Sequence, residues 1–246
     1  MALQEEFESL GNRFFRWRSY LPLCMALVFL AALWSQPHAA SPGHPGRAWQ
    51  TGCLLVSLAG LGLRFFTVGF APRGTSGRNT QGQVAETLNT TGIYSLVRNP
   101  LYLGNFLIWL GLSLLIKVWW CTVIVILCFI LFYERIIFAE EAFLRERFAG
   151  AFMDWAAGTP AIIPCFRNWR PPSLPFSWKS ALRREYSSWF ATITSFTVLA
   201  ILRDSLQNGR LMLDKNWLVI FGCTLAIYLG LRTLKKKTQI LSTVDR

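Results

Sequence analysis

Charged residues are scarce in this chain of 246 residues. They make up 15% of it, against about 25% in an average soluble domain, whereas 53% is hydrophobic and the mean hydropathy is +0.36. This balance excludes an ordinary soluble domain, a disordered tail and a charged coiled-coil rod. An integral membrane protein remains. At about 20 apolar residues per span, its length allows roughly six helices and no large domain outside the membrane.

Histidine and paired cysteines are also almost missing. The two histidines, His38 and His44, stand together among prolines, far in sequence from the long polar loops. The six cysteines form no C-x-x-C pair, and five of them lie in apolar runs. We therefore predict no histidine base, no metal site and no disulfide framework near those loops, and interpret the cysteines as small packing residues.

Six apolar runs predict an all-α, polytopic bundle of about six membrane spans. They cover approximately residues 20–34, 49–70, 101–116, 118–138, 188–202 and 217–231. Only Lys117 separates the third run from the fourth, which predicts a tight helical hairpin.

Lysine and arginine are distributed unevenly between the two sides of this bundle. Nineteen lie in the termini and the two long loops, and five lie in the alternate loops. Because such residues favour the cytoplasmic side, we expect both termini and both long loops to be cytoplasmic. The net charge of +12 is thereby explained by topology, without a nucleic-acid partner. The expected location is a bacterial inner membrane, or the endoplasmic reticulum membrane in a eukaryote.

The two long loops hold most of the polar sequence. Loop 71–100 contains several glycines and many hydrogen-bonding side chains, far more than a connector needs, which predicts a binding surface rather than a linker. In the second loop, apolar residues recur at helical spacing between charges and predict an amphipathic surface helix that ends at Gly158 and Pro160.

Glu140 and Glu141 are adjacent carboxylates at the predicted membrane boundary. Such a pair is costly there unless a cation meets it. Two interpretations stay open: an ion pair with Arg145 or Arg147 about one turn further on, or a bound cationic ligand.

Two sequence blocks resemble a known family. Residues 92–104 read G-x-Y-x-x-x-R-N-P-x-Y-x-G, and residues 140–148 read E-E-x-x-L-x-x-x-F. Together they resemble the signatures of the membrane methyltransferases that include the isoprenylcysteine carboxyl methyltransferases and the phospholipid methyltransferases. The resemblance covers about residues 49–164. Asn99 stands where many members have histidine, and Ile136 stands where the prenylcysteine enzymes have a substrate-binding arginine, which puts prenylcysteine in doubt as the substrate.

The resemblance implies S-adenosyl-L-methionine as the cofactor, with Glu140 at its positive end and Arg98 orienting the loop or the cofactor carboxylate. A strand-like stretch over 86–89 would help to cradle it. The implied cofactor-binding residues are Glu86, Thr87, Leu88, Asn89, Tyr94, Asn99, Pro100, Leu101, Tyr102, Gly104 and Glu140. The implied catalytic residues are Arg98, Asn99, Glu140 and Glu141. Gly60 and Gly62 also resemble a G-x-G motif of the phospholipid enzymes, although helix packing is the commoner use of such a pair within a span.

Methyl transfer to an anionic oxygen needs no base, which suits a site without histidine. Arg64, a charge within an apolar run, and Arg135 are predicted to hold the anionic group of a membrane lipid. Arg64 could instead extend to the interface. Phospholipid N-methylation, carboxyl methylation of a lipidated cysteine and, more distantly, an NADPH-dependent membrane reductase remain alternatives.

The chain is accordingly divided into three parts. Residues 1–48 form an amphipathic segment and the first span, residues 49–164 the methyltransferase core, and residues 165–246 a linker with two further spans.

Overall fold

The computed structural model describes residues 3–35, 46–72, 75, 83 and 85–241. In this part of the chain the fold is built from seven α-helices and contains no strand, as predicted. The helices are α1 (Leu3–Trp17), α2 (Leu21–Trp34), α3 (Arg47–Phe70), α4 (Pro100–Ile116), α5 (Trp119–Gly158), α6 (Trp178–Asn208) and α7 (Lys215–Lys237). Two short 3₁₀ helices, η1 (Ile93–Ser95) and η2 (Phe166–Asn168), lie in the long loops. Both histidines fall outside the described residues.

Each of the six predicted apolar runs lies within one helix. Three helices, α3, α5 and α7, are long and apolar enough to cross a membrane, and α2 and α4 are shorter apolar helices. This is the composition of a helical membrane bundle. The predicted hairpin is also present, since α4 ends at Lys117, which adopts the left-handed conformation with φ 62°, and α5 begins two residues later.

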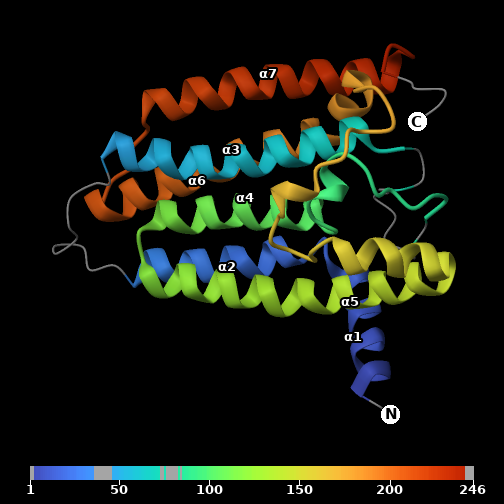
Figure 1. Ribbon diagram of the computed structural model, residues 1–246. Helices are drawn as coiled ribbons and strands as arrows, with labels where there is room; N and C mark the ends of the chain where they lie inside the picture. Colours follow the sequence, from blue (N-terminus) through green and yellow to red (C-terminus); the bar gives the residue numbers. More distant parts are fainter. Residues whose placement is uncertain (1–2, 36–45, 73–74, 76–82, 84, 242–246) are drawn as a thin grey trace.

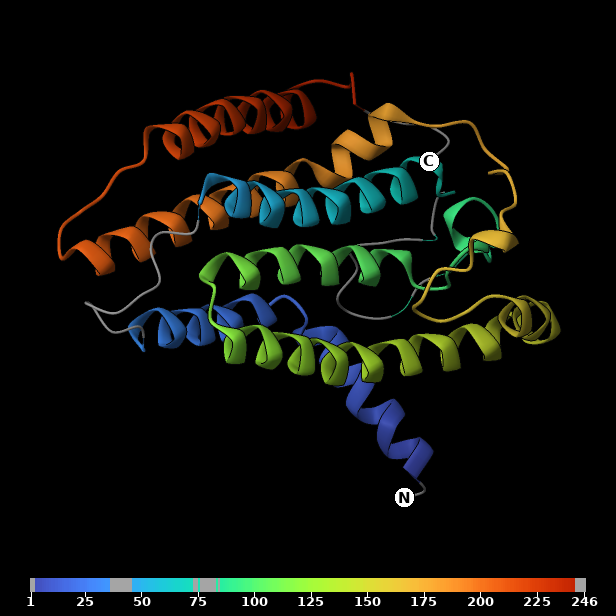
Figure 2. The same ribbon diagram turned by 60° about the vertical axis from the view of Figure 1, so that its left-hand side comes forward.

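Helices α2 to α7 lie side by side, with α4 between α3 and α5 and with α7 on the outside against α6 (Figures 1 and 2). Helix α1 crosses α5 obliquely and projects from the bundle. The loops that contain η1 and η2 gather at one end, opposite the α4–α5 hairpin. Both long loops therefore meet at the same end of the bundle, where a shared site is possible.

The predicted surface helix does not begin at the charged residues Glu140 and Glu141. Helix α5 continues unbroken through Glu140 to residue 148, about 45 Å at 1.5 Å per residue, which exceeds the thickness of the hydrocarbon core. It changes direction at Ala149, where φ is 42° and ψ is −117°, and ends at Gly158 as predicted. The charges after residue 139 had suggested a boundary between two helices, but a charged residue does not end a helix that other contacts support.

Close packing of α3 on α4 depends on glycine. A Cβ on Gly104 would lie 2.5 Å from Arg64 Cγ and 2.8 Å from the Gly60 carbonyl oxygen. Gly60 therefore serves helix packing, which is the commoner use of such a glycine within a span. Gly62 has no atom within 4 Å of such a Cβ.

We expect Gly104→Ala to destabilise the protein by about 1–3 kcal/mol, because the added methyl group must push α3 and α4 apart. Gly62→Ala is the matched control on α3 and should be neutral or slightly stabilising, since alanine favours helix. The measurement is the thermal unfolding midpoint in detergent. Equal midpoints for the two variants would contradict this account of the contact.

Candidate active site

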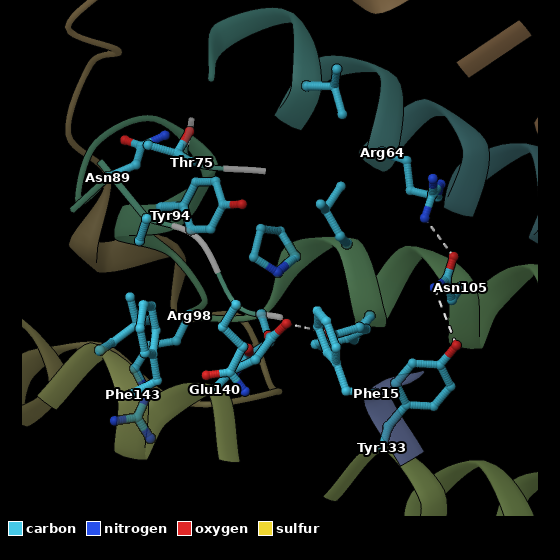
Figure 3. Close-up of a pocket in the computed structure, with 18 of the residues that line it drawn as sticks. Phe15, Arg64, Thr75, Asn89, Tyr94, Arg98, Asn105, Tyr133, Glu140 and Phe143 are labelled. Atoms are coloured by element: carbon cyan, nitrogen blue, oxygen red, sulfur yellow. Dashed lines mark hydrogen bonds between the residues drawn. The ribbon is translucent and has the colours of Figure 1, made fainter. Parts of the chain in front are cut away.

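A cavity of about 480 Å³ lies at the end of the bundle where the long loops meet (Figure 3). Its volume is typical of a small-molecule site. The turn after α1, loop 85–99, and helices α3, α4, α5 and α6 all contribute to its wall. The predicted residues that line it are Arg64, Thr87, Leu88, Asn89, Tyr94, Arg98, Asn99, Pro100, Leu101, Tyr102 and Glu140. The two sequence blocks and the first polar loop are therefore brought together.

Glu140 faces this cavity from α5. Its Oε1 atom accepts a hydrogen bond of 2.8 Å from the hydroxyl of Tyr102 on α4. Phe143 and Leu144, one turn further along α5, also line the wall. A carboxylate held by one neutral donor and surrounded by aromatic and apolar side chains is suited to meet a positively charged group.

Glu141 points away from the cavity, as expected for an adjacent helical position about 100° round the axis. Its Oε1 lies 3.3 Å from Arg98 Nε and accepts a bond of 3.4 Å from Asn99 Nδ2. Asn99 also donates to the carbonyl of Ala161, at 3.1 Å, and the Arg98 amide donates to the carbonyl of Pro160, at 2.9 Å. Glu141 thus fastens the first loop to α5, and its ionic partner is Arg98 instead of Arg145 or Arg147.

Tyr94 forms another part of the wall. Burial raises the pKa of its phenol well above the usual range, and the charge of Glu140 raises this pKa further. The phenol consequently stays neutral and can donate a hydrogen bond into the site. Trp155 fixes this segment by donating from Nε1 to the Tyr94 carbonyl at 3.2 Å.

The strand predicted over 86–89 does not form. This stretch consists of bends and irregular backbone, and Glu86 is exposed and does not line the cavity. The loop is ordered instead by Gly92, whose φ is 60° and whose amide donates to the Arg170 carbonyl at 3.0 Å. One isolated bridge to the second loop therefore replaces the strand.

Arg64 lines the cavity, but its guanidinium already has partners. Nε and Nη2 bind the two carboxylate oxygens of Glu185 on α6 at 2.9 and 2.8 Å, and Nη1 donates to Asn105 Oδ1 at 2.6 Å. Sequence reasoning missed Glu185 and Asn105. One signal was available: Glu185 is the single carboxylate between residues 155 and 203, and an arginine within a span needs a partner.

Two further predicted residues lie outside the cavity. Gly104 lies in the contact between α3 and α4, so it does not line the cavity. Arg135 lies on another face of α5, where its guanidinium covers the ring of Phe7 at 3.4 Å from the ring centre. The physical reason is helical phase, since Arg135 follows the cavity residue Tyr133 by two positions, about 200° round the helix.

Comparison with known proteins assigns the central part of the chain. Residues 53–151 match the profile of the phospholipid methyltransferase family. These residues, less than half of the chain, are similar to a phospholipid methyltransferase domain. The resemblance drawn from the two blocks is confirmed, since both lie within the matched residues. Glu185 lies beyond this domain, although it contributes to the same cavity.

Two relatives of the chain are named for metal resistance and not for methyl transfer. The chain is 34% identical over 143 residues to the cobalt-zinc-cadmium resistance protein CzcN of Cupriavidus metallidurans, covering 58% of each chain. It is 32% identical over 142 residues to the nickel-cobalt-cadmium resistance protein NccN of Alcaligenes xylosoxydans xylosoxydans, covering 57% of this chain and 65% of the relative. The match therefore spans less than two thirds of either relative. No solved structure matches the chain.

Proposed function

We propose that this protein transfers a methyl group from S-adenosyl-L-methionine to an anionic oxygen of a membrane lipid. The observation that carries the proposal is the placement of Glu140: a carboxylate within the residues that match the methyltransferase family faces the cavity and is held by Tyr102. When bound, this cofactor supplies a methyl group on a positively charged sulfur. Glu140 is the group in the wall that suits this charge, and loop 87–89 with residues 94–102 offers the surface for the rest of the molecule.

The balance of charge in the wall supports an anionic acceptor. Four arginines line the cavity, namely Arg18, Arg64, Arg98 and Arg184, against two glutamates, Glu140 and Glu185. No histidine is among the described lining residues. A phosphate or carboxylate oxygen is already charged at neutral pH and attacks the methyl carbon without a base, whereas an ammonium acceptor must first lose a proton.

The names of the two relatives fit this chemistry. Both are named for resistance to metals, cobalt and cadmium among them, and an anionic membrane surface attracts cations. Methylation of a lipid phosphate oxygen removes negative charge from that surface and so weakens the attraction. We therefore infer that lipid methylation by this protein lowers metal binding at the envelope.

The site is expected on the cytoplasmic side of a bacterial inner membrane. The uneven distribution of lysine and arginine supports this orientation, because both long loops belong to the basic set. The cofactor would reach the cavity from the loop end, and the lipid from between the apolar helices.

The first test separates the methyltransferase from a reductase. S-Adenosylhomocysteine should raise the melting temperature of the detergent-solubilised protein, by linkage worth about 2.7 kcal/mol at 100 times its Kd. NADPH serves as the matched control ligand and should have no effect. A shift with NADPH alone would replace the proposal with the reductase.

The second arm of this test identifies the acceptor. The protein is incubated with methyl-labelled S-adenosylmethionine in mixed micelles of phosphatidic acid, phosphatidylglycerol and phosphatidylethanolamine. Label should appear on a phosphate oxygen, as determined by mass spectrometry. Label on the ethanolamine nitrogen would show phospholipid N-methylation, and no labelled lipid would refute a glycerophospholipid phosphate as the acceptor.

A further inference from the structure

A chain of polar side chains lines one side of the cavity. It links Glu185 on α6, Arg64 on α3, Asn105 on α4 and Tyr133 on α5. Figure 3 shows its last three members in line, joined by two hydrogen bonds. The Arg64 bond to Asn105 measures 2.6 Å and the Asn105 bond to Tyr133 measures 3.4 Å. All four side chains line the cavity.

The direction of every bond in this chain is fixed by chemistry. Arginine can only donate, so the atom of Asn105 that meets Arg64 must be the amide oxygen. The amide nitrogen of Asn105 then faces Tyr133 and donates to its hydroxyl oxygen. The Glu185 carboxylate holds Arg64 through two bonds and so prevents it from turning away.

The hydroxyl proton of Tyr133 is consequently available. Its oxygen accepts from Asn105, so its own hydrogen must point elsewhere, and no acceptor for it is found among the described residues. The residue is 7% exposed. A buried donor without an acceptor is costly, and the space next to it is the cavity.

We propose that Tyr133 donates this proton in a hydrogen bond to the anionic head group of the methyl acceptor, and that Asn105, Arg64 and Glu185 fix its direction. This inference rests on the proposed function. The rings of Tyr102 and Tyr133 are neighbours, with centroids 4.9 Å apart, so the hydroxyl at Glu140 and the hydroxyl at Asn105 mark two adjacent subsites. The first faces the sulfonium and the second faces the acceptor.

The role of Tyr133 is to hold the lipid, and its proton is not transferred. It binds a non-reacting oxygen of the head group, while another oxygen attacks the methyl carbon. The new oxygen–carbon bond forms as the sulfur–carbon bond breaks, and the electron pair of that bond remains on sulfur. The lipid loses one negative charge and the cofactor loses its positive charge, so the reaction needs no further reactant.

Two substitutions test the donor in different ways. Tyr133→Phe removes the hydroxyl. Asn105→Asp keeps it but turns it, because a carboxylate can accept from Arg64 with one oxygen and from Tyr133 with the other. The aspartate also keeps a partner for Arg64, since it adds an attractive charge beside the guanidinium. Tyr228→Phe is the matched control on α7, where the hydroxyl accepts from Arg232 outside the cavity.

The probe is dioctanoyl phosphatidic acid, titrated into the detergent-solubilised protein with S-adenosylhomocysteine present. We expect both Tyr133→Phe and Asn105→Asp to weaken its binding about 10–100-fold, as for the loss of a hydrogen bond to a charged group. The double variant should be no weaker than either single one. Stabilisation by S-adenosylhomocysteine should stay unchanged in all of them.

The outcomes separate this inference from the function it rests on. Absence of stabilisation by S-adenosylhomocysteine in the unsubstituted protein would refute the proposed function. With that stabilisation intact, unchanged lipid binding by Tyr133→Phe would overturn the role of Tyr133. Full lipid binding by Asn105→Asp, with Tyr133→Phe impaired, would overturn the fixed direction of the bond.

Discussion

Glu140→Gln is expected to slow methyl transfer about 10²–10³-fold, the usual cost of removing one electrostatic contact at a reacting centre. The substitution keeps the size and shape of the side chain, and the amide oxygen can still accept from Tyr102. Only the charge that would face the sulfonium under the proposed function is lost. The measurement is the turnover of methyl-labelled cofactor at saturating lipid, with the melting temperature as a test of folding.

Glu134→Gln is the matched control for this experiment. Glu134 lies on the same helix, six residues earlier, with a side chain that is 56% exposed and outside the cavity. Its substitution should leave turnover unchanged. Glu141→Gln should have an intermediate effect, because it loosens Arg98 without changing the charge in the cavity. Near-normal turnover by a folded Glu140→Gln would show that this carboxylate only supports packing.

The sequence was sufficient to predict the elements that depend on local patterns. Apolar runs located the helices, and the single residue Lys117 located the hairpin. The two blocks at 92–104 and 140–148 both contribute residues to one cavity, as the family resemblance implied. Tyr102 and Glu140, one from each block, are in fact hydrogen-bonded.

Two predictions differed from the structure although helical geometry would have corrected them: the position of Arg135 and the boundary at Glu140. The position of Arg135 follows from helical periodicity, which puts Tyr133 and Glu140 two turns apart on one face and Arg135 on another. The continuity of α5 through Glu140 was missed because adjacent charges were taken as a boundary. A helix supported on one side by α4 and on the other by α1 does not end there.

The contribution of α6 could not be predicted from local sequence. Glu185 reaches Arg64 across 121 positions. Its place as the single carboxylate between residues 155 and 203 marks it as a candidate partner, but the contact itself depends on how α6 packs against α3. The same packing brings a residue from outside the stretch that matches the methyltransferase family into the cavity. The carboxylate that neutralises Arg64 is therefore a feature of this chain's own C-terminal part.

Replacing Glu185 with leucine is accordingly expected to destabilise the fold by about 3–5 kcal/mol, the usual cost of leaving one member of a buried ion pair without its partner. The two side chains are 15% and 3% exposed, so water can replace little of the interaction. Arg64→Leu should be similarly costly, because it leaves the more deeply buried Glu185 carboxylate alone. The measurement is the free energy of unfolding in mixed detergent.

The double variant Arg64→Leu with Glu185→Leu distinguishes a lost partner from general disruption of α6. It should recover most of the stability, since apolar residues of similar size often replace a buried pair without loss. Glu134→Leu is the control at an exposed pair and should cost at most about 1 kcal/mol. If Glu185→Leu costs no more than this control, solvent or lipid already reaches Arg64, and Glu185 does not set the direction of the polar chain that ends at Tyr133.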